Sequence, residues 1–250
     1  YAAVTSTPGC APEYYYYYGL TLLQNGRCAA ADSIFEQYLA QRPRDPRAPH
    51  LRQSCEYRRQ LETRHLDEYQ LYHLDFNSPQ NDFGAAFYQE GLVFASDRHS
   101  QERARGPFLD LYWAGPLSIT PRGLSGPIAP APFSEALNSR WHEAMAAFNP
   151  NQSIIYLTRS RKVEKRSREK SVNPLEVVYA RQLEEGGWSE LRSLPFNSDH
   201  YSVAHPTLTT DGKGLFFSSD MPGGFGGADI YFSSWSNGHW SWPENLGAAV

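Results

Sequence analysis

An Asn-Ser pair occurs three times in the chain at intervals of about 60 residues, and a similar run of apolar residues follows each copy. The copies are Asn77-Ser78, Asn138-Ser139 and Asn197-Ser198. A repeat of this length is typical of proteins built from recurring supersecondary units. We therefore expect a repeat protein from about Tyr69 to the end of the chain.

Each copy contains short strand-like segments separated by Gly, Pro, Asn and Asp. Phe94, Tyr156 and Phe217 are equivalent positions in the second segment of the three copies. An Asp-Gly turn at Asp211-Gly212 separates two such segments in the third copy, as a tight hairpin requires. This organisation predicts three blades of a WD40-like β-propeller, and because closed propellers have about four to eight blades, a larger closed ring.

The residues before Tyr69 show apolar spacings of three and four, which indicate helices over residues 12–24, 28–40 and 46–65. The spacing matches a tetratricopeptide repeat at Tyr15, Tyr18, Gly19, Leu22, Ala31, Phe35 and Pro43, and departs from it at Tyr38. Since a single repeat cannot bury its own apolar face, further repeats are expected before Tyr1. The predicted fold class is α+β multidomain, with a TPR-like helical segment over residues 1–66 and propeller blades over residues 67–250.

Composition indicates an ordered chain long enough for two domains: 250 residues, 40% hydrophobic and 20% charged. A net charge of −4 and a pI near 6.1 indicate no general attraction to nucleic acid. The sequence contains no apolar run of 18 residues, so no transmembrane segment is expected.

The three cysteines, Cys10, Cys28 and Cys55, all fall in the helical part and lack the CxxC spacing of a zinc site. Cys28 and Cys55 lie on adjacent predicted helices and are the better pair for a disulfide. Three buried free thiols are the favoured alternative.

Two stretches of the third copy carry a family resemblance: LPFNSDHYSVAHPTLTTDGKGLFFSSDMPGGFGGADIYF at 194–232 and WSWPENLG at 240–247. They resemble the WD40-like (PD40) repeat of Bacteroidetes OmpA-family envelope lipoproteins, and the resemblance covers most of residues 74–247. It implies a scaffold or adaptor in the periplasm, at the inner face of the outer membrane. The implied partners are other envelope proteins, ring components of the type IX secretion system, and peptidoglycan. The peptidoglycan-binding domain and the lipid anchor would both lie outside this chain.

Several acidic residues are candidates for a catalytic carboxylate. Asp97 and Asp220 occupy equivalent repeat positions, as do Asp110 and Asp229, which favours a structural role repeated in each unit. Glu143 is the one unrepeated candidate for a glycosidase carboxylate. The chain has no GxSxG elbow, and the spacing of His200 and His205 has no strong metal precedent. We therefore expect no catalytic residue, no cofactor and no metal, and a chain that is not an enzyme.

Three sets of residues are candidates for protein interaction. Tyr14 and Tyr17 would line a peptide groove of the helical part. A basic segment lies at residues 159–170 and carries seven basic and two acidic residues. It would dock an acidic partner through Arg161, Lys162, Lys165 and Arg166, unless it is simply a solvated loop. Phe225 stands in the Gly-rich connection over residues 221–227 and is either a local anchor or a contact residue.

The alternative function is a carbohydrate- or muropeptide-binding module. In that case exposed tryptophans would stack on the sugar rings, and the candidates are Trp141, Trp235 and Trp242.

Overall fold

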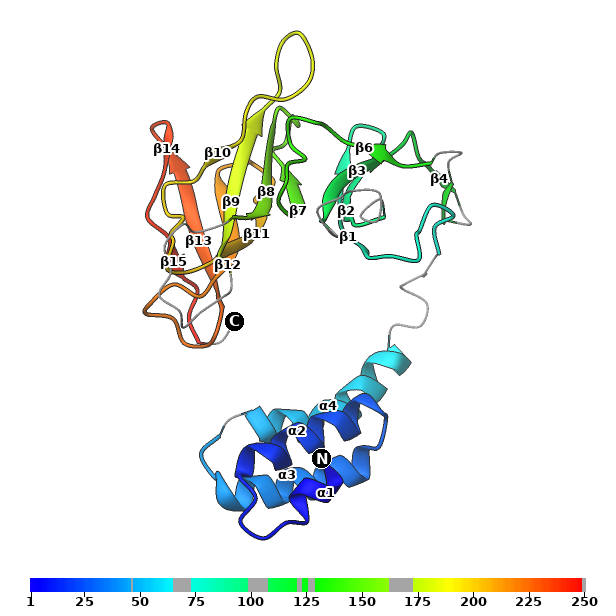
Figure 1. The fold of residues 1–250 in the computed structure, drawn as a ribbon, viewed down its shortest axis with the longest axis vertical. Coiled ribbons are helices and arrows are strands. Elements are labelled where there is room, and N and C mark those ends of the chain that lie inside the picture. The colour runs from blue at the N-terminus through cyan, green and yellow to red at the C-terminus, as the bar shows by residue number, and fades with distance from the viewer. Residues whose placement is uncertain are drawn as a thin grey trace. The chain divides into compact units, whose positions relative to one another are not determined.

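The computed structural model describes residues 1–45, 47–64, 73–98, 108–120, 123–125, 129–161 and 173–248. The chain divides into two compact units, Tyr1–Leu71 and Tyr72–Val250 (Figure 1). The expected domain boundary between residues 66 and 67 falls outside the described residues.

The first unit is helical. Its helices are α1 (Ala2–Thr5), α2 (Pro12–Gln24), α3 (Cys28–Gln41) and α4 (Arg47–Arg64), close to the predicted bounds. The core between α2 and α3 depends on Gly19, because a Cβ atom there would lie 2.5 Å from Cε1 of Phe35. With glycine at this position, Phe35 and Ala31 are fully buried in the hairpin.

A disulfide joins α3 to α4. Cys28 and Cys55 are bonded, with their Cα atoms 6.2 Å apart, while Cys10 is a free, half-buried thiol. The rest of the contact between these helices is small in apolar area, with Ala48 buried and Leu51 half-buried. The favoured expectation of three buried free thiols is therefore wrong, and the disulfide joins Cys28 to Cys55, the better pair in the sequence.

The prediction of a tetratricopeptide-like repeat is wrong. The described part of the first unit holds one hairpin, α2 with α3, followed by the longer α4, and no second copy of the hairpin. The spacing of Gly19, Ala31 and Phe35 reflects close packing of two helices, which any tight helical hairpin requires. It does not specify a repeated array.

The second unit is built of small antiparallel sheets. The first sheet has the order β1 (Asp82–Tyr88), β2 (Gly91–Ser96), β3 (Asp110–Ala114), β6 (Ala131–Pro132). The second has the order β7 (Glu143–Phe148), β8 (Ile154–Ser160), β9 (Leu175–Arg181), β10 (Arg192–Ser193). The third has β11 (Val203–Leu208), β12 (Gly214–Ser219), β13 (Asp229–Ser236) and β14 (His239–Trp240), with β15 (Glu244–Asn245) also on β13. A separate hairpin pairs β4 (Ser118–Thr120) with β5 (Gly123–Ser125).

Both faces of the second sheet are buried. Successive residues of a strand point to opposite faces, so one strand can pack against a neighbour on each side. Ile155 and Leu157 of β8 pack with residues of the first sheet, such as Leu111. Tyr156, which lies between them, packs with residues of the third sheet, such as Leu215. The sheets therefore pack in chain order, with the second between the other two.

The repeated Asn-Ser pairs have a structural explanation. The side-chain amide of Asn138 donates to the carbonyl of Leu111 at 2.9 Å and accepts the N–H of the same residue at 2.8 Å. Asn197 makes the same two bonds to Val177, at 2.7 and 3.1 Å. Each asparagine thus ties the next repeat to the third strand of the sheet before it.

A second repeated feature is a bulge in the first strand of each sheet. The residues at the bulge, Gly84, Met145 and His205, all have positive φ, of 65°, 53° and 58°. The register of β1, β7 and β11 shifts at these positions. A Cβ atom on Gly84 would lie 2.5 Å from Sδ of Met145, so glycine lets neighbouring first strands approach closely.

The prediction of a WD40-like β-propeller is also wrong. The strands of each repeat form a sheet, but in the described part of the second unit there are three small sheets and no closed ring. Strand pattern and turn chemistry determine the sheet within each repeat. Closure of a ring depends instead on the number of sheets and the angle between them, which a local pattern does not specify.

Candidate functional site

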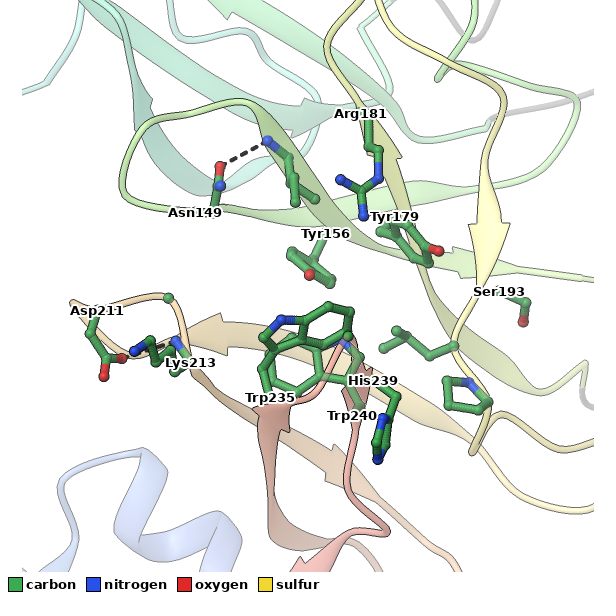
Figure 2. Close-up of a pocket in the computed structure, with 15 residues that line it drawn as sticks. Asn149, Tyr156, Tyr179, Arg181, Ser193, Asp211, Lys213, Trp235, His239 and Trp240 are labelled. Atoms are coloured by element: carbon green, nitrogen blue, oxygen red, sulfur yellow. Dashed lines mark hydrogen bonds between the residues drawn. The ribbon is translucent and has the colours of Figure 1, made fainter.

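A cleft of about 460 Å³ lies between the second and third sheets (Figure 2). Its size is within the range of about 300–1,000 Å³ that is usual for small-molecule sites. The side chains that line it come from β8, β9 and the connection after β10 on one side, and from the β11–β12 turn and the β13–β14 hairpin on the other. They include Tyr156, Tyr179, Arg181, Asp211, Lys213, Trp235, His239 and Trp240.

The β13–β14 hairpin supplies one aromatic wall. Asn237 and Gly238 both have positive φ, 51° and 82°, as a two-residue hairpin turn requires. The resulting register places Trp235 opposite Trp240, with ring centroids 5.2 Å apart in an edge-to-face arrangement. Trp240 is 7% exposed and belongs to the core, whereas Trp235 is 36% exposed and can be reached from the cleft.

The opposite wall is formed by a cross-strand tyrosine pair. Tyr156 of β8 is paired in register with Tyr179 of β9, and their ring centroids are 5.9 Å apart. Burial raises the pKa of Tyr156, so its hydroxyl stays protonated and can donate a hydrogen bond. Tyr156 also meets Trp240 edge to face, at 6.0 Å, which joins the two walls at the floor of the cleft.

Two cations and one carboxylate line the cleft. Arg181, the last residue of β9, points its guanidinium toward Tyr179 and Tyr156 in Figure 2. Lys213 stands in the β11–β12 turn, beside Asp211. The Asp211 carboxylate accepts hydrogen bonds from the hydroxyl of Thr209, at 2.5 Å, and from the backbone N–H of Lys213, at 2.9 Å. These bonds lower the pKa of Asp211, so the carboxylate is ionised and engaged in the turn.

This arrangement is suited to a ring-shaped organic ligand with polar substituents. The aromatic faces offer stacking surface, and the charged groups and hydroxyls offer oriented hydrogen bonds. Among the described residues, no group of three or more His, Cys, Asp or Glu is placed to hold a metal ion. In the same part of the chain, no helix is long and apolar enough to cross a membrane.

None of the described residues predicted for protein interaction lines this cleft. Tyr14 and Tyr17 are 45% and 50% exposed on α2, and Tyr17 stacks on Tyr1. Arg161 forms ion pairs with Asp199 and with Glu176, so its charge is already neutralised locally. Lys162, Lys165 and Arg166 lie outside the described residues.

Phe225 is 67% exposed at the tip of the Gly-rich connection. The loop is held by Asp229, whose carboxylate accepts the backbone N–H groups of Phe225 and Gly226 at 2.8 and 3.1 Å. Phe225 is therefore presented outward on a fixed turn, and it does not serve as a buried anchor.

The repeated acids have the structural roles that the repeat predicts. Asp97 accepts the backbone N–H of Asn81 at 2.9 Å, and Asp220 accepts that of Ser202 at 2.6 Å. Glu143 is fully buried and accepts the backbone N–H of Ser139 at 3.0 Å. Glu143 does not line the cleft.

Of the three tryptophans predicted for sugar stacking, Trp235 alone lines the cleft. Trp141 is half-buried under the guanidinium of Arg140, which lies 5.0 Å from its ring centroid. Trp242 is 69% exposed in the connection between β14 and β15 and does not line the cleft. The prediction missed Arg181, Lys213 and Trp240.

Comparisons with known proteins identify no family for this chain. No protein-family model matches the chain. No curated protein matches it either. Among solved structures, the chain is similar to one titled as a puromycin-hydrolysing peptidase of Mycobacterium tuberculosis, with 12% sequence identity and a TM-score of 0.37. That match covers 65% of this chain and 23% of the peptidase chain.

Two predictions are corrected at this point. The prediction that the chain is not an enzyme finds no support in the comparisons, and the likeness to a peptidase, at a TM-score of 0.37, assigns no reaction to the chain either. The predicted assignments to the OmpA family and to the type IX secretion system, including its member PorE, are unsupported, since no match points to them.

Proposed function

We propose that this chain is a saccharide-binding module whose binding site is the cleft between the second and third sheets. The observation that carries the proposal is the accessible face of Trp235 in a cleft that also presents tyrosine hydroxyls and cationic groups. A sugar ring has an apolar face of C–H groups and a rim of hydroxyls. An aromatic plane beside oriented polar groups complements both features.

A place in the bacterial cell envelope belongs to this proposal. The Cys28–Cys55 disulfide supports an oxidising compartment, such as the periplasm, where disulfides persist. Envelope glycans would be within reach of the cleft there. An adaptor role toward other envelope proteins, with peptidoglycan bound by a domain outside this chain, stays a prediction of the family resemblance.

The proposal is tested by isothermal titration calorimetry with chito-oligosaccharides and with the disaccharide of N-acetylglucosamine and N-acetylmuramic acid. Trp235→Ala should weaken binding by about tenfold or more, since an aromatic stacking contact contributes about 1 kcal/mol beyond its buried area. Trp242→Ala is the matched control, because it removes an exposed indole outside the cleft.

Equal binding by the two variants would contradict the proposed site. No heat of binding with either saccharide, at millimolar concentrations, would contradict the proposed function itself.

A further inference from the structure

Some cations of the second unit are paired with carboxylates and others are not; Arg140 and Arg192 have no ion pair among the described residues, but neither lines the cleft. Arg98 forms an ion pair with Asp82 at 2.8 Å, and Arg159 forms one with Glu176, also at 2.8 Å. For Arg181 and Lys213, no ion pair within 4.0 Å is found among the residues that the structure describes. Two cations that have no carboxylate partner in the described part of the chain therefore face a cavity, on a chain whose net charge is −4.

We propose that the cleft selects a saccharide that carries a carboxylate, with Arg181 and Lys213 as the groups that recognise its charge. This inference rests on the proposed saccharide-binding function and adds the class of sugar. Uronic acids and lactyl-substituted amino sugars are two sources of such a carboxylate.

The placement of Arg181 supports this assignment. Its guanidinium and the indole of Trp235 come from opposite sides of the cleft, so one ligand can touch both (Figure 2). The charge of Arg181 acts on the hydroxyl of Tyr156 at the floor of the cleft, where it opposes the effect of burial on the pKa of that residue. A planar guanidinium so placed matches a carboxylate with two parallel hydrogen bonds.

The single acid in the cleft does not cancel both cations. The Asp211 carboxylate accepts its hydrogen bonds from within its own turn, from Thr209 and from the backbone of Lys213. Its charge acts on Lys213 across the turn and partly offsets the positive charge there. The balance of one carboxylate against two cations leaves the cleft positive.

A carboxylate fits the cleft better than a phosphate does. Phosphate sites are typically formed by backbone N–H groups at a helix N-terminus or in a glycine-rich loop. The residues that line this cleft belong to strands and hairpin turns, and none belongs to a helix. Recognition must therefore come from the side chains, among which the arginine fork is the main charged group.

The test compares saccharides that carry a carboxylate with related saccharides that do not. Digalacturonic acid is compared with its methyl ester, and the disaccharide of N-acetylglucosamine and N-acetylmuramic acid with chitobiose, all by calorimetry on the whole chain. The native protein should bind the acid of at least one pair about tenfold more tightly than its neutral partner, because a charge-assisted hydrogen bond is about that strong. Which pair shows the preference identifies the source of the carboxylate.

The variant Arg181→Gln with Lys213→Gln should reduce this preference, taken as the ratio of the affinities for the acid and for its neutral partner, to less than about twofold. Arg192→Gln is the control, because Arg192 is an exposed cation of β10 that does not line the cleft. In the native protein the preference should also shrink as salt is raised from 50 to 500 mM, since screening weakens exposed charges.

The outcomes separate the two proposals. Equal affinity for acid and neutral partner in both pairs would overturn the carboxylate preference and leave saccharide binding intact. A full preference in the double variant would overturn the assignment to Arg181 and Lys213. Binding of none of the four sugars would contradict saccharide binding itself.

Discussion

At the scale of single residues, the amides of Asn138 and Asn197 extend hydrogen-bonded ladders that the outer strands leave incomplete. β6 and β10 have two residues each, and one more backbone bond follows each of them, from Phe133 to the carbonyl of Leu111 at 2.8 Å and from Leu194 to the carbonyl of Val177 at 3.3 Å. The asparagine side chains then accept the N–H groups of Leu111 and Val177, which are fully buried, and donate a second hydrogen bond to each carbonyl. Buried backbone groups without partners are costly, so these side chains stabilise the junctions between repeats.

Replacing Asn197 with Ala should therefore lower the free energy of unfolding by about 1–3 kcal/mol, the cost of leaving buried polar groups unpaired. Urea denaturation measures this change. Asn77→Ala is the matched control: Asn77 holds the same repeat position, but it is exposed, and its side chain has no hydrogen bond among the described residues. Its replacement should change stability by less than about 0.5 kcal/mol. Indistinguishable denaturation curves for the two variants would rule out this role of Asn197.

Glu143 makes stability depend on pH. Burial raises its pKa to about 7, opposed by hydrogen bonds from Ser139 and the charge of Arg159 and reinforced by the charge of Asp110. Because the folded-state pKa lies above the unfolded value, the folded protein binds the extra proton between these two values. The contribution of Glu143 to the free energy of unfolding is therefore complete below about pH 4.5 and is lost as the pH rises through 7.

The free energy of unfolding should fall by on the order of 2–3 kcal/mol between pH 5 and pH 8 from this group. The dependence should flatten in Glu143→Gln, which keeps the shape of the side chain without its charge. Urea denaturation across this pH range measures both proteins. A native-like slope in the variant would mean that another group titrates.

At the scale of elements, α4 is attached to the rest of the helical unit mainly by covalent and polar contacts. Its residues are largely charged or polar, and Ala48 is its one fully buried apolar residue among those described. Arg52 adds an ion pair with Glu36 at 2.8 Å, which is exposed and contributes little. The Cys28–Cys55 disulfide is thus the main restraint on α4.

Replacing both cysteines with serine should lower the stability of the helical unit by about 3.5 kcal/mol, the value expected for closing a loop of this length. The cysteines are 27 residues apart in sequence. Urea denaturation monitored by helical circular dichroism measures the loss. Cys10→Ser is the control and should change little, because Cys10 is a free thiol. Equal stability of the two variants would contradict the restraint.

The elements were the part of the structure that could be predicted from sequence. The apolar spacings of three and four indicate helices whose bounds are close to those in the structure. Short strands in each repeat were also expected, because turn chemistry such as that of Asp211-Gly212 acts within a few residues. The disulfide was not favoured, since its formation depends on how α4 packs.

At the scale of the whole molecule, prediction failed where distant segments must be combined. Neither a tetratricopeptide array nor a propeller is present in the described residues, because local spacing does not determine how many units assemble. The cleft was missed for the same reason: Arg181 and Lys213 belong to different repeats. One signal was available, since the Asn237-Gly238 turn alone places Trp235 opposite Trp240.

The central claim is that a saccharide binds in this cleft. The most direct measurement is a ¹⁵N–¹H correlation NMR titration of the whole chain with the acidic disaccharide, in which the six tryptophan side chains give separate indole signals. Each signal is assigned by a Trp→Phe variant. We predict that the indole signals of Trp235 and Trp240 shift and that those of Trp141 and Trp242 do not. Shifts confined to Trp141 or Trp242, or no shift at millimolar ligand, would contradict the account.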